Sequence, residues 1–457
     1  MPVSLSRRIV RGARSLRFDT LPREAVEKVE IALLDYFSCA FESRGLGPSV
    51  HAIELAARAP GRTTVIATPL RAAAPEAAFA NAVLGHGLVR EDMHTGSVSH
   101  LGVVVFPALL ALAESSREPA TGRDFVTAAV CGYETGAAIG RALMDRDVVK
   151  RFRPTGVTGP LGSAIAGARL RRLNEDAATS ALGFAANAIA GLNEWPVQGA
   201  DEMFFHVGFA ARNAVTAVEL AELGAFASES ALDGPAGLFA ALGKPDNTDQ
   251  VAPFSGGPLE ILSVYHKPAP ACNYAQTACQ VARMLAVEDR VRTPEIAGID
   301  VRVSAAALNY PGCNASGPFE RVLQAKMSIQ YCVAATLVRG AIEEANYRLL
   351  ADPEVKRLID AIALEEAPEF TAAYPRAQGT EITVTLHNGR VIQRRLDDLV
   401  PATPDQVRDR FRTAAGGALG SDAAIALEEA AGRLEELPDM ADLVALAAGK
   451  DRDAAAS

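Results

Sequence analysis

Two acidic residues and two histidines lie within ten positions of one another, at Glu91, Asp92, His94 and His100. The whole chain contains only seven histidines, so two in one short polar stretch require an explanation. Polar side chains that converge on a loop between helices are typical of sites for proton transfer or metal binding. The alternative is a solvated loop whose acidic residues cap the next helix.

Two further polar positions lie at expected helix starts. Arg153 precedes a Pro-Thr-Gly turn in FRPTGVTGP, and backbone N–H groups at such a turn can bind a carboxylate or phosphate. The alternative is an interhelix turn with a surface arginine. His206 lies in DEMFFHVGFAARNA, where a histidine can transfer protons or can be a hydrogen-bonded structural residue.

The segment YHKPAPACNYAQTA places Lys267 before a proline-rich stretch that is poorly suited to a helix. A lysine on such a rigid backbone can bind an anion, or lose its proton if it is desolvated. Most lysines are simply solvated, so Lys267 alone does not indicate a functional site; neighbouring functional residues are needed to support one.

A metal site is an alternative interpretation of the first loop, because Glu91, Asp92, His94 and His100 could all act as ligands. Their spacing matches no zinc template, however, and neither HExxH nor a cysteine partner accompanies them. The sequence also lacks GxGxxG after a strand, GxxxxGK[ST] and GxSxG, which are the usual motifs of nucleotide-binding proteins and hydrolases.

Composition excludes several classes of protein. The 457 residues are 49% hydrophobic and 22% charged, which is ordinary for a globular enzyme of two to three domains. The net charge of −10 argues against non-specific binding to nucleic acid. The basic N-terminus lacks an apolar core and a cleavage site, so we interpret it as mature sequence. The longest apolar runs are too short to span a membrane.

The six cysteines are widely spaced and form no CxxC motif. They are expected to be thiols in a reducing cytoplasm rather than a disulfide framework or a zinc site.

The periodicity of apolar residues predicts a mostly helical protein with a smaller α+β part. We expect a helical domain at 1–262 that is completed by 400–457, and an α+β lid domain at 263–399. Residues 297–305 alternate like a strand, and Asn388-Gly389 predicts a hairpin within 381–396. The expected helices begin at Pro22 and Pro75 and cover 103–117, 122–144, 160–172, 175–192, 207–224, 228–242, 271–288, 321–344, 404–416, 421–436 and 438–449.

The chain resembles the MmgE/PrpD family over nearly its whole length. The resemblance rests on the acidic loop followed by VVFPALLALAE, on GRDFVTAAVCGYETG, on HVGFAARNAV and on YHKPAPACNYAQTA. KMSIQYCVAATLVRG and the hairpin sequence HNGR complete it. The family includes 2-methylcitrate dehydratase, cis-aconitate decarboxylase and iminodisuccinate epimerase.

The resemblance implies a helical domain with a smaller lid domain, a homodimer, and neither a metal nor an organic cofactor. It places the active site between the domains and implies a small di- or tricarboxylate substrate, without nucleic-acid or membrane partners. The common chemistry is a carbanion-like centre beside a carboxylate, for which imidazoles transfer protons and cations stabilise the developing charge.

The resemblance also suggests roles for individual residues. We expect His100 to transfer the proton, Lys267 and Arg153 to hold the substrate carboxylates, and Tyr310 in NYPGC to be a proton donor. The full set of candidates is catalytic His100, Lys267, Tyr310 and Asp92, with substrate-binding His94, Arg153, His206, Glu91 and Cys272.

The chain departs from the family pattern at the site itself. The family loop resembles DFDDTH, whereas this chain reads VREDMH, with Val89 and Met93 in place of an acid and a hydroxyl residue. Arg153 stands where relatives have a histidine, and Met203 where they often have a lysine. These departures favour an altered substrate or an isomerisation with a single base. From the family resemblance we expect a lyase, of the dehydratase type, that acts on a 2-methylcitrate-like acid. The alternatives are an epimerase of a small dicarboxylate, a decarboxylase of a cis-aconitate-like acid, and a catalytically silent homologue.

Overall fold

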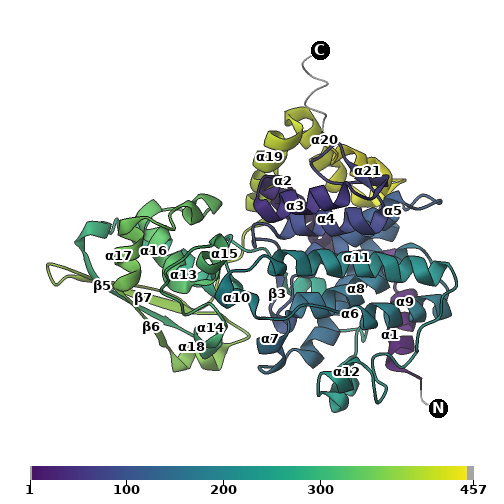
Figure 1. Ribbon diagram of the computed structural model, residues 1–457, viewed down its shortest axis with the longest axis horizontal. Helices are drawn as coiled ribbons and strands as arrows, with labels where there is room; N and C mark the ends of the chain where they lie inside the picture. Colours follow the sequence, from purple (N-terminus) through teal and green to yellow (C-terminus); the bar gives the residue numbers. More distant parts are fainter. Residues whose placement is uncertain (1–2, 450–457) are drawn as a thin grey trace.

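A computed structural model describes residues 3–449 and shows two parts that lie side by side (Figure 1). The larger part is a bundle of helices, and the smaller part is a four-stranded sheet with helices around it. This arrangement confirms the prediction of a mostly helical protein with an α+β part. The predicted domain boundaries, 1–262 with 400–457 and 263–399, stay predictions.

The larger part is built around α5, which is buried from Gly102 to Ala113. A helix that is apolar on every side must be surrounded by other elements, and α5 packs against α4, α6, α8 and α11. The helices before residue 250 are α1 Leu5–Ser15, α2 Arg23–Ser43, α3 Gly47–Ala56, α4 Ala74–His86, α5 Gly102–Glu114, α6 Gly122–Leu143, α7 Val148–Arg151, α8 Pro154–Leu170, α9 Glu175–Asn187, α10 Trp195–Gln198, α11 Glu202–Glu222 and α12 Leu238–Ala241.

The helices after residue 400 return to the larger part. They are α19 Pro404–Leu419, α20 Ser421–Ala431 and α21 Met440–Leu446. The first of them packs against α2, where the rings of Phe41 and Phe411 lie 6.2 Å apart. Thr403 and Gln406 form a capping box that fixes where α19 begins.

The smaller part contains a sheet with the strand order β6-β5-β7-β8. Its strands are β5 Ile296–Val303, β6 Ile362–Glu366, β7 Thr380–Leu386 and β8 Val391–Leu396. Strands β5 and β6 are parallel, and the other pairs are antiparallel. The helices around the sheet are α13 Gln276–Val287, α14 Ala305–Asn309, α15 Val322–Met327, α16 Ile329–Arg339, α17 Pro353–Asp360 and α18 Pro368–Ala373. The hairpin predicted at Asn388-Gly389 is confirmed, with Gly389 at φ 85°.

Two short strand pairs lie outside this sheet and were not predicted. Strands β1 Pro60–Thr64 and β2 Arg71–Ala72 form a small hairpin in the helical part. Strands β3 Met93–His94 and β4 Val264–Tyr265 pair across more than 150 residues of sequence. The second pair matters for function because it holds the acidic loop against the Lys267 segment.

Three helix predictions were wrong in extent. Within 228–242 only Leu238–Ala241 is helical, because Gly234, Pro235 and Gly237 interrupt the chain. The helix predicted at 321–344 is two helices that break at Ser328, whose side chain caps the second.

The helix predicted at 160–172 instead begins at Pro154 and continues through Pro160. Proline has no N–H to bond the carbonyl four residues earlier. That carbonyl belongs to Gly156 and accepts the Ala190 N–H at 3.2 Å instead. The helix therefore starts earlier than the sequence suggested, and its first residues lie at the site.

No helix among the described residues is long and apolar enough to cross a membrane. All six cysteines are free thiols, as the sequence predicted.

The contact between Gly156 and Ala190 gives a test of the packing. A Cβ at position 156 would overlap the carbonyl oxygen of Ala190, whereas a Cβ at Gly416 in α19 would meet open space. Gly156→Ala should lower the free energy of unfolding by about 1–3 kcal/mol, as overpacking does. Gly416→Ala should raise it by about 0.5–1 kcal/mol, because alanine favours the helix. Denaturant unfolding measures both, and an unchanged Gly156→Ala variant would contradict the close approach.

Candidate active site

The acidic loop joins the end of α4 to the start of α5 and is held from both parts of the molecule. Pairing of β3 with β4 brings Met93 opposite Tyr265. Two buried lysines of the smaller part donate to successive carbonyls of the loop, Lys267 to Val89 and Lys326 to Leu88 at 2.9 Å. The site therefore forms where the two parts meet.

The loop contains two valines in the left-handed backbone region, Val89 at φ 58° and Val98 at φ 53°. A β-branched residue in this region is strained by about 1–3 kcal/mol and persists only where the surroundings impose it. Both valines line the same small cavity. Such strain indicates a loop whose shape serves the site.

Glu91 is buried between two imidazoles. One of its oxygens, Oε1, lies 2.5 Å from His86 Nδ1 and 3.0 Å from His100 Nδ1. Burial alone would raise the pKa of Glu91, but the two imidazoles hold it well below its ordinary value. Burial lowers the pKa of both histidines, that of His100 to about 4. An ionised carboxylate thus accepts a hydrogen bond from the neutral ring of His86 and lies against the neutral ring of His100.

The hydrogen bonds of His100 fix its tautomer. Its Nδ1 lies close to two acceptors, Glu91 Oε1 and the Asp92 carbonyl oxygen at 2.9 Å, so Nδ1 carries the proton. The other nitrogen, Nε2, therefore has a free lone pair and, among the described residues, no hydrogen-bonding partner. His100 lines the cavity and has the properties of a general base.

Arg153 is a buried cation without an acidic partner among the described residues. It lies just before α8, where Nη2 donates to His86 Nε2 at 3.2 Å and the guanidinium lies 5.3 Å from the Trp195 ring. Its Nε is buried without any partner. A buried charge is costly unless it is paired, so this guanidinium is suited to bind an anion in the cavity.

Lys267 is fully buried and contacts the loop rather than the cavity. Burial lowers its pKa to about 8, and the Glu91 carboxylate acts in the opposite direction. At neutral pH the ammonium group therefore keeps a positive charge next to the cluster.

Asp92 and His94 lie in the loop but do not line the cavity. Asp92 accepts hydrogen bonds from the Gly102 N–H at 3.2 Å and from the Tyr133 hydroxyl, and burial raises its pKa to about 7. His94 accepts the Ser97 N–H at Nδ1 and bonds Glu260 through Nε2 at 3.1 Å. Both side chains fix the shape of the loop, and their predicted catalytic and binding roles stay predictions.

Of the remaining candidates, two line the cavity and one does not. Tyr310 and Cys272 line the cavity from the smaller part; Tyr310 Oη accepts from Asn193 Nδ2 at 3.3 Å, and Cys272 Sγ lies 3.6 Å from Cys313 Sγ. His206 is buried behind Arg153, with its pKa lowered to about 4 by burial. It does not line the cavity.

The cavity has a volume of about 30 Å³, which is room for about one water molecule. An outer cavity of about 410 Å³ shares Val98, Tyr274 and Tyr310 with it. Arg146 and Lys150 line the outer cavity and can attract an anion. A ligand that reaches Arg153 from this side must displace the shared side chains.

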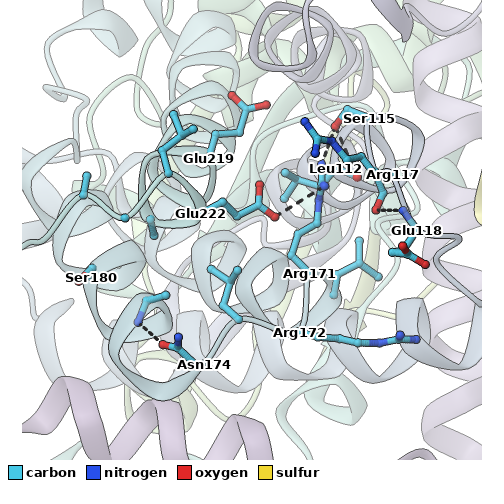
Figure 2. A pocket seen from close by; sticks show the side chains of 18 of the residues that line it. Leu112, Ser115, Arg117, Glu118, Arg171, Arg172, Asn174, Ser180, Glu219 and Glu222 are labelled. Atoms are coloured by element: carbon cyan, nitrogen blue, oxygen red, sulfur yellow. Dashed lines mark hydrogen bonds and ion pairs between the residues drawn. The ribbon is translucent and has the colours of Figure 1, made fainter.

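A far larger groove, of about 1240 Å³, lies at the other end of α5 (Figure 2). Arg171 in this groove already has partners, since it donates to Ser115 at 2.8 Å and lies 3.6 Å from Glu222. No histidine or cysteine lines it. Its size therefore does not make it the candidate site.

Three residues of the site, His86, Lys326 and Trp195, were not predicted from the sequence. His86 ends α4, five residues before Glu91, and its place among only seven histidines was a usable signal. Lys326 and Trp195 gave no such signal, because their relation to the loop arises only from tertiary packing. Among the described residues, no group of three or more His, Cys, Asp or Glu side chains is arranged to hold a metal ion.

A neutral, oriented imidazole beside an unpaired buried guanidinium is typical of an enzyme that transfers protons near an anionic group. The comparisons identify which enzymes. Residues 7–250 match the MmgE/PrpD N-terminal domain, and residues 269–436 match the MmgE/PrpD C-terminal domain. The chain belongs to the MmgE/PrpD family and is an enzyme of that type.

Curated relatives match over most of their length. The cis-aconitate decarboxylase-like protein oryM of Aspergillus oryzae is 27% identical over 95% of both chains. The human cis-aconitate decarboxylase is 29% identical over 82% of this chain and 79% of its own. The cis-aconitate decarboxylase of Aspergillus terreus is 23% identical over 96% of this chain and 94% of its own.

The protonation state of His100 can be measured directly. Because burial lowers its pKa to about 4, we expect the ring to stay neutral, with the proton on Nδ1, well below the usual histidine pKa of about 6.5. Nitrogen-15 NMR shifts recorded from neutral pH down to about pH 5 report both properties. The His100→Gln variant assigns the signal. A His100 resonance that titrates near pH 6.5 would contradict the buried, Glu91-bound ring.

Proposed function

We propose that this enzyme is a lyase that acts on a small carboxylic acid through a carbanion-like centre beside a carboxylate. The observation that carries the proposal is Arg153, a buried guanidinium without a carboxylate partner in the described chain, next to the neutral base His100. A substrate carboxylate would supply the missing counter-charge and place its α-carbon near the imidazole.

Proton abstraction by His100 is the first step that this geometry favours. Nε2 accepts the α-proton while Nδ1–H stays bonded to the Asp92 carbonyl, and the Glu91 carboxylate 3.0 Å away stabilises the imidazolium that forms. Arg153, which lines the cavity, disperses the negative charge on the enolate. Tyr310 gives its proton to a departing hydroxide, so that water and an alkene are the products. This sequence is a dehydration, as the resemblance suggested.

Decarboxylation is the second candidate, and the names of the relatives favour it. Here the bond from the α-carbon to a carboxylate breaks, carbon dioxide leaves, and the electron pair stays on carbon. A proton from Tyr310, which lines the cavity, then completes the product. The carbanion is the same as in dehydration, and the same positive charge of Arg153 stabilises it.

The reaction can be assigned with a panel of small mono-, di- and tricarboxylic acids in deuterated water, followed by proton NMR. Dehydration gives new alkene signals without carbon dioxide, and decarboxylation gives carbon dioxide with deuterium at the new C–H. Deuterium exchange without net product would instead support an epimerase. An absence of all three across the panel would overturn the proposed activity and favour a silent homologue.

Replacement of His100 tests its role. His100→Ala should lower kcat by about 10²–10⁴-fold, which is the usual contribution of a general base or acid. Lys267→Ala should mainly raise KM, because it removes the donor that holds the carbonyl of Val89, a residue of the cavity wall. His387→Ala is the matched control, since this histidine is exposed at the hairpin of β7 and β8 and should leave turnover unchanged. Near-normal turnover of His100→Ala on the acid found above would overturn the assignment and turn attention to His206.

The homodimer and the cytoplasmic location are also proposals. The first rests on the family resemblance, and the second on six free cysteines without a disulfide. Light scattering and cell fractionation test them separately from the chemistry.

A further inference from the structure

The wall of the inner cavity is unusually apolar for a site that binds carboxylates. Six of its twelve lining residues are apolar, and three of the seven methionines in the chain are among them. The six are Val89, Met93, Val98, Trp195, Met203 and Met327. Each has at most 4% of its surface exposed except Val98, so the apolar part of the wall is almost wholly buried.

Only one permanent charge lines the cavity, that of Arg153. The other cations nearby are already balanced by acids. Lys326 forms an ion pair with Glu344 at 2.8 Å, and the charge of Lys267 is opposed by Glu91. His100 is neutral, since burial lowers its pKa to about 4. The inner site therefore offers one uncompensated positive charge.

A substrate with three carboxylates could place one on Arg153 and one on the neutral donors of the wall, and would have to bury the third against methionine and valine. Each buried charge without a partner is costly, because no hydrogen bond or ion pair replaces its hydration. A carboxylate on Arg153, with an alkyl group against the methionines, avoids this cost and gains from apolar burial. The neutral donors in the wall, Asn273, Tyr274 and Tyr310, can still bind a carbonyl, a hydroxyl or one further carboxylate.

We propose that the substrate is a mono- or dicarboxylic acid that carries an apolar arm, rather than a tricarboxylate, with one carboxylate on Arg153 and the arm against Met93, Met203 and Met327. The inference rests on the proposed function and specifies its substrate class. Methionine side chains are unbranched and flexible, so three of them around a cavity of about 30 Å³ can move aside to admit such an arm.

Two unreactive acids of similar shape test the inference. Tricarballylate has three carboxylates, and isobutylsuccinate has an isopropyl group in place of one of them. Calorimetric titration of the full-length protein should show isobutylsuccinate binding at least about tenfold more tightly, because desolvation of an unpaired carboxylate costs more than about 1.4 kcal/mol. Arg153→Gln should weaken the binding of both acids.

Variants of the wall separate the arm from the carboxylate. Met327→Gln places a polar group of similar size in the wall and should reduce the ratio of the Kd for tricarballylate to the Kd for isobutylsuccinate. Met327→Leu keeps the wall apolar and should leave this ratio unchanged. Thermal unfolding of each variant identifies any that fail to fold. Equal binding of the two acids, or tighter binding of tricarballylate, overturns the inference and leaves the proposed lyase intact. Binding of neither acid, with no turnover of the wider panel, overturns both.

Discussion

The buried carboxylate of Glu91 is the group on which the arrangement of the site depends. A carboxylate without partners in a protein interior is very costly. The Nδ1–H of His86 bonds one oxygen of Glu91, and Nδ1 of His100, which donates to the Asp92 carbonyl, lies 3.0 Å from the same oxygen. Since each ring donates from Nδ1, each Nε2 is left as an acceptor. Arg153 donates to Nε2 of His86, whereas Nε2 of His100 remains available to accept a proton from the substrate. One buried charge thus fixes two tautomers and gives the two rings different roles.

Small residues allow the helices to bring these groups together. A side chain at Gly85 would meet the ring of Tyr36 at 2.6 Å, and one at Gly102 would overlap the Tyr133 hydroxyl and the Asp92 carboxylate. The close approach at Gly102 lets Asp92 accept a hydrogen bond from the start of α5, which fixes the loop that carries Glu91 and His100. Alanine- and glycine-rich helices therefore do more than fill the core, because their spacing sets the geometry of the loop between them.

The sequence predicted what depends on local pattern. The helix after Pro22 and the hairpin at Asn388-Gly389 follow from proline, from periodicity and from turn chemistry. The prediction of a helix at 228–242 was wrong. It gave more weight to the spacing of the apolar residues than to the glycines that break the helix. Within the site, spacing predicted that acids and histidines would gather near residue 91 but not which would face the cavity. That choice depends on the left-handed backbone of Val98 and on the pairing of His94 with Val264, which no local pattern encodes.

The unpaired guanidinium of Arg153 connects stability with function. A buried charge without a partner lowers the stability of the free protein, and the two strained valines of the loop add about 1–3 kcal/mol each. An anion that binds only the folded state restores stability by mass action, by about 2.7 kcal/mol when its concentration is 100 times Kd. The cost of burying Arg153 without a carboxylate partner is therefore greatest in the absence of a ligand. The same features that destabilise the empty site make the binding of a carboxylate favourable, which is the relation expected of a preorganised active site.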